Sequence, residues 1–271
     1  MEERAAGEVE AAGWAELTYE AIAPLYDAYT SHHDYEGWLA ELVQALERRG
    51  LRGRRLLDVA CGTGKSFLPM LPRGWEVTGC DISASMLERA RAKVGEEVRL
   101  SVADMRELPV FGEFDLVWSL DDAVNYLLGE GELVQALRGM GSNLAPTGLL
   151  LFDVNTLLAY RTFFAETVTL AGLEREGRVV WRGETAFDVE PGSICEARLT
   201  TEDGVARLSE DGGEELATHR QRHFPEAEVL AALACTGLEC LDVYGSGLDG
   251  VPRKPLDEAV HTKAIYIARA A

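Results

Sequence analysis

An acidic residue followed by a turn with two glycines is the part of this chain whose spacing best fits ligand chemistry. Asp58 lies in an apolar run, and Gly62 and Gly64 follow in a turn of small residues before a helical pattern begins. Glycine has no Cβ, so the backbone of such a turn can bend tightly and approach a bound molecule. A turn that joins a strand to a helix N-terminus is a common ligand site in sheets of parallel strands. The segment therefore predicts a small-molecule site where the first strand ends.

Two phosphate-binding interpretations of this turn fail at single positions. A P-loop has a glycine five residues before the glycine of its final Gly-Lys-Ser, and Val59 stands there instead. The dinucleotide fingerprint has a third glycine that lets helix and strand pack closely, and Phe67 occupies that position. A nicotinamide-dependent oxidoreductase would require this third glycine to be dispensable. Both interpretations are less favoured than a ligand without phosphate.

Alternating strand and helix signals surround the turn and predict a doubly wound α/β sheet. Acidic residues stand at or beside the carboxyl ends of four predicted strands, which is the edge where open α/β sheets bind ligands. A helical pattern from Leu133 to Leu144, stopped by Pro146, precedes the last strand. The predicted strands are Arg55–Ala60, Glu76–Cys80, Val98–Ala103, Phe114–Leu120 and Leu149–Val154, and the acidic residues are Asp81, Asp104, the pair Asp121-Asp122, and Asp153.

Three short motifs together resemble those of the class I S-adenosylmethionine-dependent methyltransferases. They are Cys-Gly-Thr-Gly at 61–64, Gly-Cys-Asp-Ile-Ser at 79–83 followed by Met86, and Ala-Asp-Met at 103–105. Each motif alone is weakly specific, but the three occur in order at the ends of successive predicted strands. The resemblance extends from about Tyr19 to the end of the chain. It implies a Rossmann-like seven-stranded sheet and S-adenosyl-L-methionine as the cofactor.

The resemblance also implies where each part of this methyl donor binds. Asp81 would accept hydrogen bonds from both ribose hydroxyls, and charge-assisted bonds of this kind contribute about 1.5–3 kcal/mol each. Asp104 would lie beside the adenine amino group, with Ile82 and Met105 on the two faces of the ring. The methionine ammonium would meet backbone carbonyls of the turn and of the fourth strand's end. The expected cofactor-binding residues are Asp58, which fixes the turn, Ala60, Gly62, Gly64, Asp81, Ile82, Met86, Asp104, Met105, Leu120 and Tyr19.

A tyrosine-rich helical pattern near the N-terminus predicts a cover for the site. Tyr19, Ile22, Tyr26 and Tyr29 recur at spacings that place them on one helical face, although Pro24 interrupts the pattern. Phenol groups favour a lid over a purely apolar seam, while packing in the core remains the alternative. In the family this segment lies over the donor's methionine end and the acceptor. Tyr26 would orient or deprotonate the acceptor there, and the rings would stabilise a sulfonium by cation–π contact.

The segment after the fourth predicted strand resembles that of small-molecule methyltransferases rather than that of nucleic-acid amino methyltransferases. Asp122, Asn125 and Tyr126 match the small-molecule pattern, whereas Asp121 replaces a residue that is often aromatic. Two adjacent carboxylates could hold a cationic amine or cap the next helix, and both interpretations stay open. His219, on the last predicted inserted strand, would line the opposite wall. The expected catalytic residues are Tyr26, Tyr19, Asp122 and His219, and no metal ligands are expected.

After Asn155 the pattern of alternating strands and helices gives way to strands alone. Segments rich in Val, Thr and aromatic residues alternate across Thr167–Phe224, with turn residues at Pro191-Gly192 and Asp203-Gly204. This pattern predicts an inserted antiparallel sheet, and a helix over Pro225–Thr236 and two strands follow. The predicted division is an N-terminal helical cover at 1–50, a donor-binding core at 51–155, a substrate lid at 156–224 and completion of the core at 225–271.

Composition restricts the partners and the compartment. The chain carries 46 acidic and 26 basic side chains, a formal charge of −20 that repels nucleic-acid phosphates. Its five cysteines include no Cys-x-x-Cys pair, which fits reduced thiols better than a disulfide framework. No stretch approaches the ~20 apolar residues of a membrane span, and the acidic first residues lack a signal-peptide pattern. We expect a cytoplasmic protein that binds neither nucleic acid nor membrane; the oligomeric state stays open.

These observations predict transfer of a methyl group from S-adenosylmethionine to a small molecule. The donor is already activated, so the protein mainly has to position the acceptor and exclude water. The inserted sheet resembles that of glycine/sarcosine-type and amino-sugar N-methyltransferases, which favours an amine nitrogen as the acceptor. Two alternatives stay open: O-methylation of a natural-product hydroxyl, and a non-catalytic protein that binds the donor but has lost its acceptor site.

Overall fold

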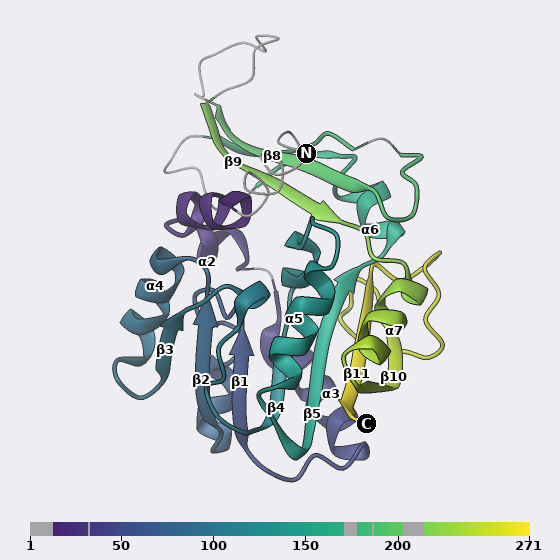
Figure 1. The fold of residues 1–271 in the computed structure, drawn as a ribbon. Coiled ribbons are helices and arrows are strands. Elements are labelled where there is room, and N and C mark those ends of the chain that lie inside the picture. The colour runs from purple at the N-terminus through teal and green to yellow at the C-terminus, as the bar shows by residue number, and fades with distance from the viewer. Residues whose placement is uncertain (1–12, 32, 171–177, 186, 203–213) are drawn as a thin grey trace, which may run out of the picture.

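Two β-sheets form the framework of the protein (Figure 1). The computed structural model describes residues 13–31, 33–170, 178–185, 187–202 and 214–271. A seven-stranded sheet has the order β10-β11-β5-β4-β1-β2-β3, and a four-stranded sheet has the order β6-β7-β8-β9. The smaller sheet lies across the end of the larger one at which the parallel strands β1, β2 and β4 finish (Figure 1). The edge at which the site is expected therefore faces the smaller sheet.

The large sheet is parallel except for β11, which runs antiparallel to both β5 and β10. Reversal of this strand brings its first residue, Lys263, opposite the last residue of β5, Asn155. Lys263 therefore starts at the edge where the parallel strands end. The strands are β1 (Arg55–Val59), β2 (Glu76–Asp81), β3 (Arg99–Val102), β4 (Phe114–Ser119), β5 (Leu144–Asn155), β10 (Leu238–Ser246) and β11 (Lys263–Ala270).

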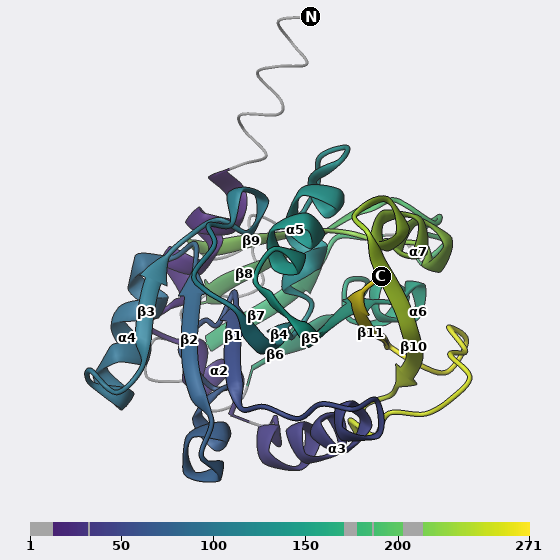
Figure 2. The same ribbon diagram turned by 60° about the horizontal axis from the view of Figure 1, so that its bottom comes forward.

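Helices cover both faces of the large sheet because successive strand residues point to opposite sides. Leu57 of β1 belongs to the core cluster shared with α5 and α7, and its neighbour Leu56 belongs to the cluster shared with α3. Figure 2 shows α3 on one side of the sheet and α5 and α7 on the other. The helices are α3 (Tyr35–Arg48), α4 (Ala84–Val94), α5 (Glu132–Gly141), α6 (Leu157–Thr162) and α7 (Glu226–Cys235), with short 3-10 turns η1 (Leu68–Arg73), η2 (Met105–Glu107) and η3 (Ala123–Tyr126).

The N-terminal segment lies over the glycine turn, as the tyrosine pattern predicted. Residues 13–22 are helical and α2 (Tyr26–Tyr29) follows. Asp27 accepts a hydrogen bond from Thr63 of the turn at 2.5 Å and pairs with Lys93 of α4 at 2.6 Å. Lys65 in turn donates to the Thr30 carbonyl at 2.7 Å. These polar contacts fasten the segment to the turn from both sides.

The predicted inserted sheet is confirmed as an antiparallel sheet. It comprises β6 (Thr167–Thr169), β7 (Arg178–Gly183), β8 (Ile194–Glu202) and β9 (Glu214–Arg222). The helical segment at 13–22 reaches its edge strand, because Thr18 donates a hydrogen bond to the Thr218 carbonyl at 2.6 Å. The Pro191-Gly192 turn is present between β7 and β8, with Gly192 in a left-handed conformation. The predicted Asp203-Gly204 turn lies outside the described residues.

Two predicted boundaries around Pro146 are wrong: the end of the helix expected at Leu144 and the start of the strand expected at Leu149. The helix expected to run from Leu133 to Leu144 ends at Gly141, and β5 already begins at Leu144, so Pro146 lies inside a strand. Proline is tolerated there because the pairing of β5 with β4 is irregular between Phe114 and Leu116. A residue without a ladder partner loses nothing by lacking an N–H group. No described helix is both long enough and apolar enough to cross a membrane.

Phe67 explains why the turn carries glycine at its second position. Its ring is fully buried in the core cluster beside α3, directly beneath the turn. A Cβ added at Gly64 would come within 2.6 Å of the Phe67 ring, and Gly64 also has a φ of +85°. The Phe67 side chain thus fills the space that a third glycine would leave open in a dinucleotide site.

We predict that Phe67→Ala destabilises the protein by about 3–5 kcal/mol, because it leaves a cavity beneath the turn. Urea unfolding followed by circular dichroism measures the change. Phe187→Ala is the matched control, because that phenylalanine is 69% exposed and its loss should change the free energy of unfolding little. Equal effects of the two substitutions would show that Phe67 does not support the turn.

Candidate active site

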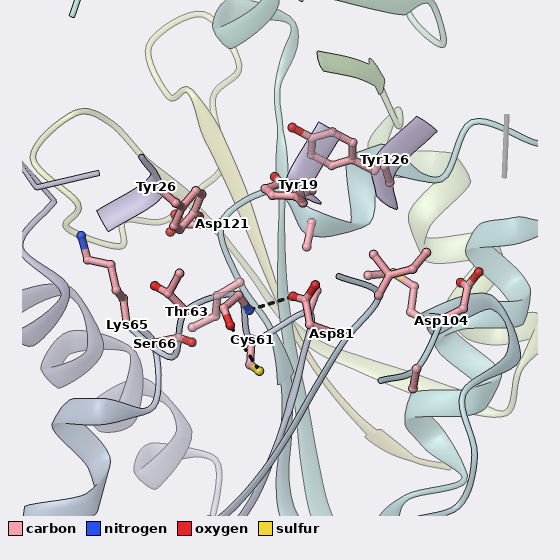
Figure 3. A pocket seen from close by; sticks show the side chains of 18 of the residues that line it. Tyr19, Tyr26, Cys61, Thr63, Lys65, Ser66, Asp81, Asp104, Asp121 and Tyr126 are labelled. Carbon is pink, nitrogen blue, oxygen red and sulfur yellow. Dashed lines mark hydrogen bonds between the residues drawn. The ribbon is translucent and has the colours of Figure 1, made fainter. Parts of the chain in front are cut away.

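A cleft opens at the carboxyl edge of the large sheet, beneath the N-terminal segment (Figure 3). It holds about 880 Å³ of unoccupied space, its open mouth included. That size is typical of sites for a cofactor-sized molecule. Its lining comes from the glycine turn, from the loops that follow β2, β3 and β4, and from the tyrosines of the cover. The loops that end neighbouring parallel strands therefore form one continuous wall.

Asp81 joins the glycine turn to the start of α4. One carboxylate oxygen accepts from the Gly62 N–H at 2.8 Å, and the other accepts from the Ser83 N–H at 2.9 Å. Burial raises the pKa of Asp81 to about 6, although these two N–H groups favour the charged form. Each oxygen keeps a lone pair for a further donor, because a carboxylate has about four acceptor positions. Asp81 can therefore bind a ligand and hold the turn at once.

Asp58 holds the turn from below. Its side chain is 1% exposed, and one oxygen accepts from the Ser66 hydroxyl at 2.5 Å. Burial raises its pKa to about 7, against the hydrogen bond from Ser66. The Trp118 side chain also favours the charged carboxylate and opposes the rise in its pKa. Asp58 does not line the cleft, so its contribution is to fix the turn.

Asp104 is engaged by a neighbour in its own loop. The Arg106 Nε donates to both carboxylate oxygens at 2.9 Å, and the Arg106 backbone N–H donates to one of them. Arg106 also reaches Glu132 at the start of α5, at 3.3 Å. Both Asp104 and Arg106 line the cleft. The carboxylate is thus held in place, with 30% of its side chain still exposed.

Tyrosine rings form the wall opposite the glycine turn (Figure 3). The rings of Tyr19 and Tyr26 are 6.1 Å apart between centroids, and those of Tyr19 and Tyr126 are 5.2 Å apart. Burial raises the pKa of Tyr19 and of Tyr26 well above the ordinary value of a phenol. Both hydroxyls therefore stay protonated near neutral pH and can orient a ligand. The raised pKa of Tyr26 therefore favours a role in orienting the acceptor over a role in removing a proton from it.

The pair Asp121-Asp122 separates into two different roles. Asp121 lines the cleft and accepts a hydrogen bond from the Tyr35 hydroxyl. Asp122 does not line the cleft, and its carboxylate accepts from Gln221 at 2.5 Å and from Lys263 at 2.7 Å. Asp122 does not cap η3 with its side chain, so that interpretation is wrong. The cation beside Asp122 is Lys263 of the protein itself.

His219 lies behind the tyrosine wall instead of lining the cleft. Its Nδ1 is 2.6 Å from the Tyr126 hydroxyl, and the imidazole is 3% exposed. Burial lowers its pKa to about 4, so the ring is neutral near pH 7. The Trp181 ring packs against it, with the centroids 5.0 Å apart. His219 therefore fixes the position of Tyr126, which does line the cleft.

The structure brings most of the expected site residues together. Met86 is an exception, since it is fully buried in the cluster with Ile22 and Tyr160, on the inward side of α4. Gly64 turns away over Phe67. The expected residues that line the cleft are Tyr19, Tyr26, Ala60, Gly62, Asp81, Ile82, Asp104, Met105 and Leu120, and those that do not are Asp58, Gly64, Met86, Asp122 and His219.

Sequence reasoning missed several residues at or beside the cleft. Tyr35, Lys65 and Arg106 line it, and Lys263 lies beside Asp122. Lys263 left a signal: several carboxylates at one sheet edge need a counter-charge, and this lysine directly precedes an apolar strand. Only the reversed direction of β11 places it at that edge. Among the described residues, no group of three or more His, Cys, Asp or Glu side chains could hold a metal ion.

Comparisons with known proteins identify the family. A family model described as "Methyltransferase domain" matches residues 56–148. The "Putative methyltransferase YqeM" of Bacillus subtilis is 31% identical over 241 residues, which are 87% of this chain and 92% of that relative. The chain belongs to the class I S-adenosylmethionine-dependent methyltransferases.

This methyltransferase uses S-adenosylmethionine as its methyl donor, as the motifs implied. A solved S-adenosylmethionine-dependent methyltransferase from Clostridium acetobutylicum matches with a TM-score of 0.74 at 20% identity, covering 93% of this chain and 99% of that chain. This likeness confirms the predicted Rossmann-like fold. The dTDP-3-amino-3,4,6-trideoxy-alpha-D-glucopyranose N,N-dimethyltransferase of Streptomyces venezuelae is 27% identical over 208 residues, which are 76% of this chain and 84% of that relative.

We predict that Asp58→Asn becomes more stable relative to the wild type as the pH rises from 5 to 8. The folded state holds the Asp58 proton up to about pH 7, whereas the unfolded chain releases it near 3.8. Wild-type stability is therefore lost as the pH rises through the folded-state pKa, by roughly 1–3 kcal/mol over this range. The variant has no such proton to release. Urea unfolding at several pH values measures the difference.

The control is Asp249→Asn, in an exposed carboxylate whose pKa is lowered to about 2 by hydrogen bonding to Arg253. Asp249 is ionised in both folded and unfolded states throughout this pH range. Its variant should therefore differ from the wild type by a constant amount. A constant difference for Asp58→Asn as well would show that Asp58 carries no raised pKa.

Proposed function

We propose that this methyltransferase methylates the amine nitrogen of a small molecule. The observation that carries the proposal is the carboxylate of Asp121 in the cleft wall, at the opposite end from Asp104 (Figure 3). A carboxylate there attracts a methyl acceptor that is cationic or that donates hydrogen bonds. An amine meets this description. The similarity to an amino-sugar N,N-dimethyltransferase supports the same acceptor class. The acidic surface, with a net charge of −20, supports a small molecule over a nucleic acid.

The residues of the cleft fit the donor along its whole length. Asp104 would lie at the adenine end and Asp81 at the ribose, in the order in which Figure 3 shows them along the cleft. Gly62 has a φ of +54°, and apart from its chain neighbours only a Tyr26 ring carbon, at 3.9 Å, lies near the position of a Cβ among the described residues. The turn is therefore an open cradle for the methionine end. Leu120, at the end of β4, would complete that end with its backbone carbonyl.

When bound, the donor supplies a methyl group on a positively charged sulfur, which is ready for in-line displacement. The tyrosines of the cover would exclude water and present their ring faces to that charge. Asp121 would hold the positive charge that the acceptor nitrogen gains as it is methylated, which stabilises the transition state more than the neutral amine. Tyr126, fixed by His219, would orient the acceptor by accepting its N–H. Asp122 contributes through the loop rather than by touching the acceptor.

We predict that Asp81→Ala lowers the affinity for S-adenosylhomocysteine by about 100-fold or more, because two charge-assisted hydrogen bonds to the ribose are lost. Isothermal titration calorimetry measures the dissociation constant. Asp249→Ala, which removes an exposed carboxylate, should bind as the wild type does. An Asp81→Ala affinity within a few-fold of the wild type would place the ribose elsewhere.

The acceptor class is tested by transfer of a radiolabelled methyl group to a panel of small amines, amino sugars, phenols and alcohols. We predict turnover of an amine, and a drop of about tenfold or more in kcat/KM for that amine in Asp121→Asn. Asparagine tolerates the left-handed conformation at this position, so the variant should fold. Binding of S-adenosylhomocysteine should be unchanged. Turnover of hydroxyl compounds alone would overturn the proposed acceptor and favour O-methylation.

A further inference from the structure

The loop that carries Asp121 into the cleft has an unusual backbone. Asp121 and Asp122 are consecutive residues with φ angles of +58° and +53°, and neither is a glycine. Residues other than glycine rarely adopt this left-handed backbone conformation, so the surrounding contacts must maintain it. Asp121 lines the cleft, and Tyr126 at the end of η3 lines it too. The conformation of this loop therefore decides where two side chains of the cleft wall stand.

Asp153 binds the backbone of the loop that carries Asp121 and Asp122. Its two carboxylate oxygens accept hydrogen bonds from consecutive N–H groups, those of Asp121 at 2.7 Å and of Asp122 at 3.0 Å. The Asp153 side chain is fully buried on β5 and does not line the cleft. A carboxylate that accepts two consecutive N–H groups fixes both peptide planes, and this holds the left-handed turn.

Lys263 joins the carboxylates of this anchor. Its ammonium lies 2.7 Å from an Asp153 oxygen, 2.7 Å from an Asp122 oxygen and 4.0 Å from an Asp121 oxygen. Burial alone would lower the pKa of Lys263, but the three carboxylates outweigh burial and raise it. Lys263 is therefore charged, and it is the cation that allows three carboxylates to stand together.

The four-stranded sheet contacts the Asp121–Asp122 loop from the other side. Gln221 of β9 donates to Asp122 at 2.5 Å and accepts from the Asn155 amide at 2.9 Å. Asn155 is the residue opposite Lys263 at the start of β11. Residues of both sheets therefore hold Asp122 in place. Because Asp121 precedes Asp122 in the same turn, its direction depends on these contacts.

We propose that Lys263 is a positioning residue for the methyl acceptor: with Asp153 it holds the Asp121–Asp122 turn so that Asp121 faces the cleft. The proposal rests on the proposed function, in which the acceptor binds beside Asp121. Lys263 is not part of the cleft lining and acts through the loop alone. Without its charge, the carboxylates of Asp121, Asp122 and Asp153 repel one another and the turn loosens. The glycine turn and Asp81 belong to other strands and keep their geometry.

The test compares Lys263→Met with Lys254→Met, which removes a lysine paired with another buried carboxylate, Asp242, away from the cleft. Amide hydrogen exchange followed by mass spectrometry reports on the loop without any acceptor. We expect faster exchange in the peptide over 119–127 of Lys263→Met only. Exchange over 58–66, which contains the glycine turn, should stay as in the wild type in both variants.

Kinetics with the best amine acceptor, or radiolabel transfer, then show whether the loop positions the acceptor. In Lys263→Met, KM for the acceptor should rise about tenfold or more, with the dissociation constant of S-adenosylhomocysteine within about threefold of the wild type. Lys263→Arg, which keeps the charge, should recover part of the loss. A merely structural role would weaken acceptor and donor binding together, and that result overturns the proposal.

Unchanged exchange over 119–127 in Lys263→Met also overturns the proposal, whatever the kinetics show. If Lys263→Met does not fold, Asp153→Asn takes its place, because it removes one of the two backbone hydrogen bonds and leaves the side-chain shape. A wild type that methylates no amine fails the proposed function, and the exchange measurement still decides whether Lys263 holds the loop.

Discussion

The active-site edge depends on buried carboxylates that accept hydrogen bonds from backbone N–H groups of neighbouring loops. Asp81, at the end of β2, holds the turn after β1 in this way, and Asp153 near the end of β5 holds the loop after β4. Parallel strands bring such residues to one edge, and each carboxylate ties its own strand to the loop that follows the neighbouring strand. The resulting charge is large for a buried edge, so hydrogen bonds and one lysine have to compensate for it.

Much of the cleft lining expected to bind the donor was predictable because it follows from local sequence. The glycines of the turn, Asp81 and Asp104 stand at fixed distances from strand ends, and strand ends can be found from apolar runs. Met86 was expected at the site but lies in a buried core cluster, because a motif position does not reveal which face of a helix is turned inward. The helix boundary before Pro146 failed because an irregular strand pairing, invisible in the sequence, accommodates the proline.

The proposed acceptor half depends on contacts between distant segments, and these could not be predicted from the sequence. His219 was expected in the wall, yet it stands behind Tyr126, which lies 93 residues earlier in the chain. Asp122 was expected at the chemistry, yet Gln221 and Lys263 hold it. The direction of β11 decides whether Lys263 reaches Asp122, and alternation of apolar residues does not distinguish parallel from antiparallel strands. The N-terminal segment, the large sheet and the four-stranded sheet thus meet at the proposed acceptor side, where local patterns carry least information.

The central claim is that the donor lies along the cleft from Asp104 to Asp121, with its transferable methyl facing the tyrosines. A crystal structure with S-adenosylhomocysteine bound tests this most directly. We expect the ribose hydroxyls on the Asp81 carboxylate, the adenine beside Asp104, and the sulfur on the side of Tyr19, Tyr26 and Asp121. A ligand bound in the reverse direction, or one that leaves the Asp81 carboxylate without a contact, would contradict the claim.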